Sequence, residues 1–219
     1  MKNTLIVTGG TIELDYMKEY LASHKFDCVI AVDGGLDTIA RLNMVPSYVV
    51  GDFDTVSLNV LSSYRSNPNI KFIQYNSEKD FTDTKSAIEL AIEIGSLSIT
   101  IFGGLGTRLD HTLANIQMLH MPLEYGIDAV IVNVHNRIRL LGVKRKEIEI
   151  EKSDYRYVSV LPMSENVTGL TLEGMKYPLK DYEMLVNKDY SMGVSNEIVG
   201  DKAKVKLKSG KIILIESRD

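Results

Sequence analysis

The sequence predicts an α/β domain over residues 1–134 followed by an all-β domain over residues 135–219. Two observations lead to this prediction. Up to about residue 134, short and nearly continuous runs of Val, Ile and Leu alternate with segments of helical period, as in a parallel sheet with helices on both faces. Beyond that point the helical period disappears, and strand patterns follow one another with Gly, Asn, Asp, Ser and Pro between them.

The strands predicted for the first domain are apolar along their whole length, rather than at every second residue. That pattern is typical of parallel strands that helices bury on both faces. These strands cover residues 5–8, 28–32, 48–50, 71–74, 98–102 and 129–132.

Two helices of the first domain stand out. Residues 83–94 carry one apolar stripe and a glycine stop signal, formed by Ala87, Ile88, Ala91, Ile94 and then Gly95. A second helix begins at Asp110, which we expect to act as its N-cap. The side chains expected around one side of this helix are Leu113, Ile116, Leu119 and His120.

The second domain contains strand patterns at residues 138–143, 147–151, 155–161, 168–172, 203–207 and 211–215. Between residues 202 and 208 every second residue is lysine, so one face of that strand is apolar and the other is charged. Such alternation is typical of an antiparallel sheet with one face in water. We interpret the lysines as a solvated face rather than a nucleic-acid patch.

Composition excludes several classes of protein. The chain has 219 residues, of which 44% are hydrophobic, and a formal net charge of −4, which argues against sequence-independent binding of nucleic acid. Cys28 is the single cysteine, so no disulfide forms within the chain, as expected for the reducing cytoplasm. No apolar run approaches the ~20 residues of a membrane span, and the N-terminal apolar run is too short for a signal peptide.

Acidic residues and glycines follow the predicted parallel strands. Because ligands bind beyond the carboxyl ends of such strands, these segments are expected to share one cleft. The segments are Asp33-Gly34-Gly35, Gly51-Asp52-Phe53-Asp54, Glu78 to Asp83, and Gly103-Gly104 up to Arg108 and Asp110.

This grouping predicts a metal–phosphate site. Carboxylates in one cleft repel each other unless a cation lies among them, and Mg²⁺ prefers oxygen ligands that it shares with phosphates. Asp52 and Asp54 would point the same way from an extended segment, with Phe53 facing the core. Glycine backbones can approach phosphate oxygens closely, and the planar fork of Arg108 suits the same oxygens.

Simpler explanations exist for each piece. Asp33-Gly34 is common in plain turns, and Asp110 can be a helix cap and nothing more. The first strand ends in Thr8-Gly9-Gly10-Thr11, which is neither a P-loop nor a dinucleotide-binding fingerprint, and no cluster has zinc spacing. His111 lies at the expected cleft edge, and its role stays open. The coincidence of all the acids on one edge favours the metal–phosphate site.

The ordered set of motifs resembles the thiamin pyrophosphokinase family of the bacterial type. The resemblance covers nearly the whole chain, and it is specific as a set although each piece is short. It is carried by Asp33-Gly34-Gly35, Gly51 to Thr55, Lys79-Asp80-Phe81-Thr82-Asp83, Gly103-Gly104 with Arg108, Asp110 and His111, the 169–179 segment, and Ser195-Asn196-Glu197.

The resemblance implies a fold and a reaction. The fold would be a three-layer α/β/α catalytic domain followed by an antiparallel β-sandwich that contributes to thiamin binding and dimerisation. The enzyme would move a diphosphoryl group from ATP to the hydroxyl of thiamin with Mg²⁺, giving thiamin diphosphate and AMP. It would work in the cytoplasm as a homodimer, with thiamin near the interface.

The resemblance also implies residue roles. Asp52, Asp54 and Asp83 would gather around Mg²⁺ as catalytic residues, together with Arg108 on the phosphate oxygens. The nucleotide would contact Asp33, Gly34, Gly35, Asp80, Thr82 and Gly104. Thiamin would contact Asp110, Ser195 and Asn196.

The sequence departs from the family pattern at two points. Thr55 stands where the family usually has Ser, which keeps a hydroxyl group. The chain has no Trp, whereas some relatives stack an indole on thiamin, so Tyr190 or Met192 is a candidate replacement. Two alternatives stay open: a diphosphokinase for another hydroxyalkyl heterocycle such as a pterin, and a nucleotide-binding regulatory module without catalysis.

Overall fold

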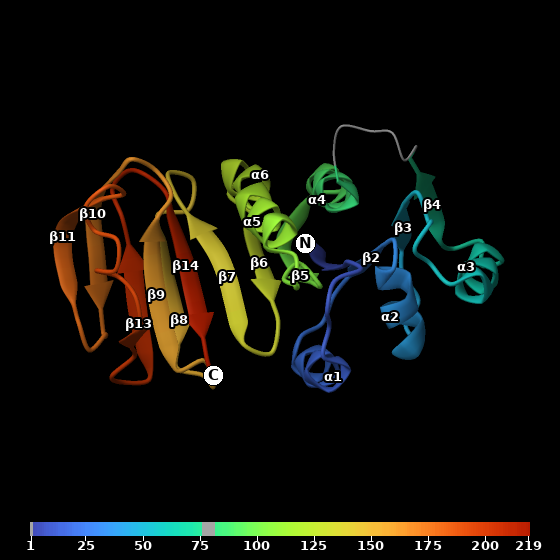
Figure 1. Ribbon diagram of the computed structural model, residues 1–219, viewed down its shortest axis with the longest axis horizontal. Helices are drawn as coiled ribbons and strands as arrows, with labels where there is room; N and C mark the ends of the chain where they lie inside the picture. Colours follow the sequence, from blue (N-terminus) through green and yellow to red (C-terminus); the bar gives the residue numbers. More distant parts are fainter. Residues whose placement is uncertain (1, 76–81) are drawn as a thin grey trace. The chain divides into compact units, whose positions relative to one another are not determined.

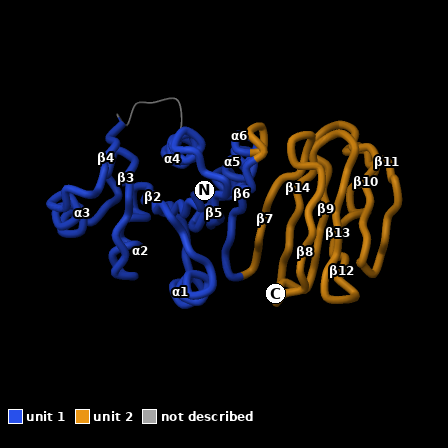
Figure 2. The backbone as a smooth tube through the Cα atoms, turned by 180° about the vertical axis from the view of Figure 1, so that it is seen from behind, with its two compact units in different colours: residues 1–122, 127–134 blue, residues 123–126, 135–219 orange. Residues whose placement is uncertain are grey.

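The computed structural model describes residues 2–75 and 82–219. The chain divides into unit 1, Met1–Pro122 with Ile127–Val134, and unit 2, Leu123–Gly126 with His135–Asp219 (Figure 2). The predicted nucleotide contact Asp80 lies outside the described residues, as do Glu78, Lys79 and Phe81.

Unit 1 is built on a parallel sheet (Figure 1). Its strands are β1 (Lys2–Val7), β2 (Cys28–Val32), β3 (Tyr48–Gly51), β4 (Lys71–Gln74), β5 (Ser96–Phe102) and β6 (Asp128–Val132). They lie in the order β6-β5-β1-β2-β3-β4, and every neighbouring pair is parallel. The chain therefore runs outward from β1 to β4 and then returns to the other side of β1.

Helices cover both faces of this sheet (Figure 1). They are α1 (Leu14–Ser23), α2 (Gly35–Arg41), α3 (Leu58–Arg65), α4 (Asp83–Glu93), α5 (Leu109–Met118) and α6 (His120–Glu124). Met17 of α1 and Leu36 of α2 pack with Leu5, Val7 and Phe102 in one core, whereas α4 lies on the opposite face. In the described part of the chain, no helix is both long and apolar enough to cross a membrane.

Helix α4 forms where the sequence predicts it. Its N-cap is Thr82, whose Oγ1 accepts a hydrogen bond from the backbone N–H of Lys85 at 3.4 Å. Ala87, Ile88 and Ala91 are fully buried, so the apolar stripe faces the sheet.

Helix α5 differs from its prediction. It begins at Leu109 with Arg108 as the N-cap residue, so Asp110 lies in the first turn and is not the cap. No residue of α5 is buried, and Leu113 is 52% exposed, which contradicts the predicted apolar side at that position. The helix ends at Met118 because Pro122 has no N–H to bond back to that turn, and Leu119 and His120 lie beyond its last residue.

Unit 2 consists of two antiparallel sheets. Their strands are β7 (Asn136–Leu141), β8 (Glu147–Glu151), β9 (Tyr157–Pro162), β10 (Asn166–Glu173), β11 (Leu179–Leu185), β12 (Asn196–Glu197), β13 (Lys202–Lys206) and β14 (Ile212–Ser217). One sheet has the order β12-β9-β14-β7 and the other β11-β10-β13-β8. Apolar side chains of both sheets form one core, so the predicted fold class, α/β followed by an antiparallel β-sandwich, is confirmed.

The lysine-rich strand β13 has the predicted faces. Ala203 and Val205 are buried in the core of unit 2. The alternating lysines pair across the sheet with acids: Lys202 with Glu149 at 2.8 Å, Lys204 with Glu147 at 3.1 Å and Lys206 with Glu173 at 3.1 Å. Since their charges are matched by neighbouring acids, these lysines form a solvated face, as predicted.

Candidate functional site

A pocket of about 710 Å³ lies in unit 1 where the strand order changes direction. The strand order reverses between β1 and β5, and residues after β1, β2 and β5 line this pocket, as expected for ligand sites of open α/β sheets. Of the predicted site residues, those that line it are Asp33, Gly34, Thr82, Asp83, Gly104 and Arg108. The volume is that of a typical small-molecule site.

The backbone turns around this pocket approach each other without intervening side chains. A Cβ atom on Gly35 would overlap the carbonyl oxygen of Val7, and one on Gly10 would overlap that of Gly103. Any other residue at these two positions would push the turns apart. The glycines therefore keep three strand ends in contact and leave the backbone accessible from the pocket.

The aspartate turn after β3 is not extended, contrary to the prediction. Phe53 has a φ of +69°, and the backbone N–H of Asp54 donates to Oδ1 of Asp52 at 3.1 Å, which makes a local turn. The predicted burial of Phe53 is confirmed: it is 6% exposed, and its ring meets that of Phe72 edge to face at 5.9 Å. The turn replaces the extended form because it satisfies the Asp54 N–H within the loop.

The carboxylates of this region act on one another. Burial, followed by the negative charge of Asp83 and then of Asp52, raises the pKa of Asp33 to about 7. A hydrogen bond with Asp52 and the charge of that residue raise the pKa of Asp54. Asp33, Asp52, Asp54 and Asp83 therefore form one electrostatic cluster although three separate loops supply them.

The donor chemistry of this cluster fits a hard divalent cation. Mg²⁺ binds proteins through one or two carboxylates and completes its shell with water and substrate phosphates. Among the described residues, no three His, Cys, Asp or Glu side chains are arranged as a ready metal cage. A cage of that kind is not needed for Mg²⁺, whereas raised carboxyl pKa values are the mark of a site that gains from added positive charge.

The loop between β5 and α5 closes another side of the pocket. Arg108 donates two hydrogen bonds to Asp110, from Nε at 3.2 Å and from Nη2 at 2.6 Å, and this pair lowers the pKa of Asp110. Nδ2 of Asn115 donates to the carbonyl of Gly104 at 2.7 Å. These contacts fix the loop and hold the Arg108 guanidinium at the pocket edge.

Sequence reasoning missed several pocket residues. Asp37, Thr84 and Asn115 were not singled out, and the segment from Thr8 to Thr11 was noted only as a motif that did not match known fingerprints. Because residues 8–11 follow the first parallel strand, their position indicates that they line the same cleft. His111, whose role was open, does line the pocket. Asp52, Asp54, Gly35 and Asp110 are not lining residues.

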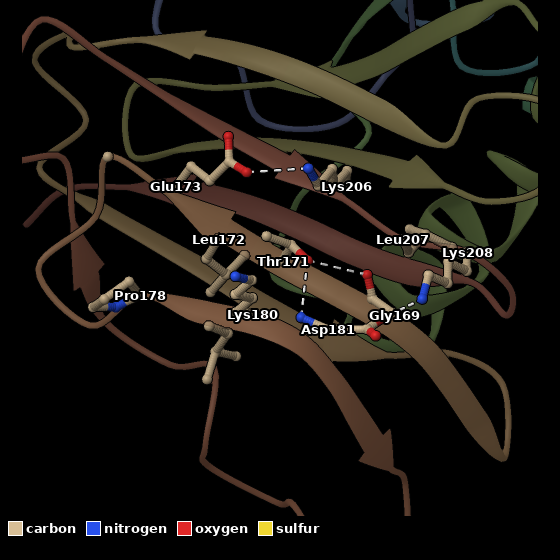
Figure 3. A pocket seen from close by; sticks show the side chains of 12 residues that line it. Gly169, Thr171, Leu172, Glu173, Pro178, Lys180, Asp181, Lys206, Leu207 and Lys208 are labelled. Atoms are coloured by element: carbon tan, nitrogen blue, oxygen red, sulfur yellow. Dashed lines mark hydrogen bonds and ion pairs between the residues drawn. The ribbon is translucent and has the colours of Figure 1, made fainter.

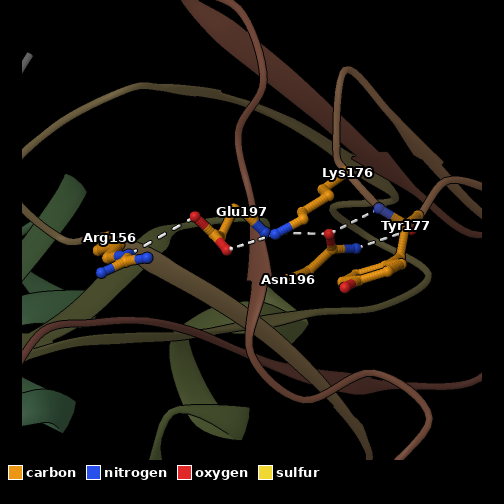
Figure 4. A network of polar contacts seen from close by, with 5 residues as sticks. All are labelled: Arg156, Lys176, Tyr177, Asn196 and Glu197. Atoms are coloured by element: carbon orange, nitrogen blue, oxygen red, sulfur yellow. Dashed lines mark hydrogen bonds and ion pairs between the residues drawn. The ribbon is translucent and has the colours of Figure 1, made fainter.

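One of the predicted thiamin residues of unit 2, Asn196, belongs to a polar network (Figure 4). Asn196 is 4% exposed, and both the oxygen and the nitrogen of its side-chain amide bond to the backbone. Its Oδ1 accepts from the N–H groups of Tyr177 and Glu197 at 2.9 and 3.0 Å, and its Nδ2 donates to the Tyr177 carbonyl at 2.7 Å. Glu197 pairs with Lys176 at 3.1 Å and with Arg156 at 3.5 Å.

Two exposed residues adjoin Asn196, Ser195 as its neighbour in the chain and Tyr177 as its hydrogen-bond partner. Ser195 has a φ of +57° and is held by its backbone N–H, which donates to Oγ of Ser159 at 3.0 Å, while its side chain is exposed. Tyr177 is 61% exposed although Asn196 clamps its backbone from both sides (Figure 4). Sequence reasoning missed Tyr177 as a candidate aromatic contact and named Tyr190 and Met192 instead, which are 76% and 55% exposed.

Unit 2 also has a hollow of about 790 Å³ on its second sheet (Figure 3). Four of its five charged side chains pair with one another: Lys206 with Glu173 at 3.1 Å and Lys208 with Asp181 at 2.6 Å. The charges of this hollow are therefore largely matched within it, whereas the carboxylates near the pocket of unit 1 raise the pKa values of one another.

Comparisons with known proteins agree with this geometry. The family model described as "Thiamin pyrophosphokinase, catalytic domain" matches residues 19–131, and "Thiamin pyrophosphokinase, vitamin B1 binding domain" matches residues 145–212. The chain belongs to the thiamin pyrophosphokinase family. A thiamine pyrophosphokinase of Bacillus subtilis is 31% identical over 220 residues, with both chains covered completely.

Solved structures of the thiamin pyrophosphokinase family have the same fold. A crystal structure of thiamine pyrophosphokinase from Bacillus subtilis matches with a TM-score of 0.87 at 30% identity over 100% of both chains. One from Geobacillus thermodenitrificans matches with a TM-score of 0.82 at 28% identity, over 99% of this chain and 97% of that one. Family membership makes the chain a kinase of the diphosphotransferase type.

Proposed function

We propose that this member of the family transfers a diphosphoryl group from ATP to the hydroxyl of thiamin, giving thiamin diphosphate and AMP. The observation that carries the proposal is the cluster of Asp33, Asp52, Asp54 and Asp83 beside glycine turns at the switch point of the sheet. Such a site combines a place for a divalent cation with backbone that can approach phosphates.

The nucleotide side of the site comprises Asp33, Gly34, Gly35, Thr82 and Gly104, with Asp80 outside the described residues. Thr82 caps helix α4, so the positive end of that helix dipole faces the pocket region and favours anionic phosphates. Arg108 adds a planar guanidinium, which is oriented by the two hydrogen bonds that it donates to the Asp110 carboxylate.

Asp52, Asp54 and Asp83 are the residues that we expect to hold Mg²⁺. When bound, the ion would neutralise charge on the phosphate oxygens, which is the main requirement of phosphoryl-type transfer. The protein itself contributes the alignment, because its turns fix where nucleotide and acceptor meet.

The reaction requires one bond to form and one to break. The thiamin hydroxyl oxygen attacks the β-phosphorus, the bond from that phosphorus to the α–β bridging oxygen breaks, and AMP leaves with the electron pair. A carboxylate of the cluster, Asp54 or Asp83, takes the hydroxyl proton.

The acceptor is recognised by Asp110, Ser195 and the segment that Asn196 supports. Thiamin carries a positive charge on its thiazolium ring, so acidic groups favour it. Since the Asn196 amide is committed to backbone partners, we infer that Asn196 positions this segment and that the exposed Ser195 makes the contact. We further propose a homodimer acting in the cytoplasm, where the buried free Cys28 stays reduced.

The proposal is tested by incubating purified protein with ATP, Mg²⁺ and thiamin and resolving the products by chromatography with phosphorus detection. Equal amounts of AMP and thiamin diphosphate are expected. ADP with thiamin monophosphate would contradict diphosphoryl transfer, and turnover with a hydroxymethyl pterin alone would contradict thiamin as the acceptor.

The same assay tests the metal residues. Asp52→Asn and Asp54→Asn keep the side-chain shape and remove one charge, so turnover should fall about a hundredfold or more with an unchanged melting temperature. Near-normal turnover in both variants would refute the assignment of Asp52 and Asp54 to the metal. Asp27→Asn, at an exposed carboxylate outside the pocket, serves as a matched control.

A further inference from the structure

Three hydrogen bonds join the turn after β2 to the loop after β3. Oδ1 of Asp33 accepts from the N–H of Phe53 at 3.3 Å, and Oγ1 of Thr55 accepts from the N–H of Gly34 at 3.1 Å. Oδ2 of Asp37 accepts from the N–H of Ser57 at 3.3 Å. We call this set the latch: Asp33, Gly34 and Asp37 on one side, and Phe53, Thr55 and Ser57 on the other.

The latch connects two strained pieces of backbone. Asp33 has a φ of +44° and Phe53 one of +69°, and neither is a glycine. A left-handed conformation costs about 1 kcal/mol or more at such residues and persists only when the surroundings fix it. At Phe53 the ring contact with Phe72 and the Asp33 bond both fix it, so the latch and the core act on the same residue.

Thr55 and Asp37 line the pocket, and neither is a member of the carboxylate cluster. The N–H of Gly34 is bonded to Thr55 and is therefore not free to bind a phosphate oxygen. In the described part of the chain Oδ1 of Asp37 has no hydrogen-bond partner, so this carboxylate contributes a single bond, the one to Ser57. Both side chains thus accept a hydrogen bond from the backbone of the opposite segment.

We propose that Thr55 and Asp37 are positioning residues that fasten the Asp52–Asp54 turn to the nucleotide turn. The two turns then move as one body, and the carboxylates keep a fixed place relative to the glycines beside them. This inference rests on the proposed function, because diphosphoryl transfer is the reaction for which the carboxylates and the glycine turn must keep fixed positions.

Amide hydrogen exchange on the metal-free, ligand-free protein tests the latch without any activity. Thr55→Val removes the acceptor and keeps the side-chain shape, and Thr55→Ser keeps the acceptor. We expect the amides of Gly34, Phe53 and Ser57 to exchange about tenfold faster in Thr55→Val, which corresponds to one lost hydrogen bond, and Thr55→Ser to restore protection. Faster exchange at Gly34 alone would overturn the proposal, because the turns would then not move together.

A second pair of variants covers the case in which Thr55→Val does not fold. Asp37→Ala removes the third bond of the latch, whereas Asp37→Asn keeps an acceptor for the Ser57 N–H. Faster exchange at Gly34 and Phe53 in Asp37→Ala, and protection in Asp37→Asn, supports the latch. Unchanged exchange at Gly34 and Phe53 in a folded Asp37→Ala overturns it.

Kinetics then separate the latch from the proposed function. Thr55→Val should lower kcat about tenfold and raise the Mg²⁺ concentration for half-maximal rate, with the thiamin KM unchanged and Thr55→Ser restoring both values. Equal kinetics in Thr55→Val and Thr55→Ser, with an active wild type, would overturn the latch alone. An inactive wild type would refute the proposed function, and the exchange measurement would still decide the latch.

Discussion

In unit 2, single residues determine which side chains are exposed. The side-chain amide of Asn196 bonds to the backbone of Tyr177 and Glu197, and Tyr177 itself is 61% exposed. A clamped backbone reduces the entropy lost when a ring stacks on a ligand. Tyr190, by contrast, is held only through its hydroxyl, which donates to the Asn187 carbonyl at 2.6 Å.

We therefore predict that Tyr177 stacks on the cationic acceptor. Tyr177→Ala should raise the thiamin KM about tenfold and leave the ATP KM unchanged, because an aromatic face attracts a desolvated cation by roughly 1–2 kcal/mol. Tyr177→Phe keeps the ring and should behave as the wild type does. A raised thiamin KM in Tyr190→Ala, without one in Tyr177→Ala, would assign the stacking to Tyr190 instead.

At the same scale, the sequence was informative about acids and less so about their supports. Asp33, Asp52, Asp54 and Asp83 could be predicted as a group because strand ends of a parallel sheet converge. Asp37 and Asn115 could not, since each is bonded to the backbone of a loop distant in sequence. Such partners depend on turn geometry, and the left-handed φ of Phe53 shows that the turn itself was not predictable from residue types.

At the scale of elements, burial decided which strands and helices could be predicted. Strand β2 is buried at every residue and has the predicted bounds, whereas β11 has one buried residue and β12 has only two residues. Both were missed because their sequences lack an apolar pattern. Asp181, with a φ of +51°, also interrupts β11 and shifts its register against β10. Helix α5 was placed wrongly at its start, because Arg108 is its N-cap residue and Asp110 lies in its first turn, where it pairs with Arg108.

The end of β11 offers a prediction about pH. Asp189 is 8% exposed, and its carboxylate accepts from the Leu185 N–H at 2.8 Å and from the Tyr182 hydroxyl at 2.9 Å. The Leu185 bond, followed by the Tyr182 bond, lowers the pKa of Asp189. A carboxyl whose pKa is lower in the folded state stabilises the fold above its unfolded pKa of about 3.9, and that stabilisation is lost as the pH falls through the folded pKa.

Asp189→Asn should therefore lower the melting temperature at neutral pH, and the difference from the wild type should shrink as the pH falls below about 4. Thermal unfolding followed by circular dichroism between pH 7 and pH 3 measures this. Tyr182→Phe, which removes one of the two donors, should give a smaller difference with the same pH trend. A difference that stays constant over the whole pH range would show that the Asp189 charge is not what stabilises the strand end.

At the scale of the whole molecule, the two units have separate cores. The core of unit 2 is formed by side chains from residues 141–214, and the core on one face of the unit 1 sheet by side chains from residues 5–132. A core that one contiguous segment completes is the physical condition for independent folding. The chain changes from the parallel strand β6 to the antiparallel strands of unit 2 after residue 134, and the domain boundary between residues 134 and 135 stays a prediction.

We therefore predict that residues 135–219, expressed alone, fold as a domain. The segment should show dispersed amide proton signals and a single urea transition with a slope of about 1–2 kcal/mol/M, as expected for a domain of this size. Val205→Asp, which places a charge in its core, should abolish the transition, whereas Lys204→Asp on the solvated face of the same strand should leave it cooperative. A segment that stays unfolded would mean that unit 2 depends on unit 1 for its stability. The chain would then be one folding unit rather than two independently folding domains.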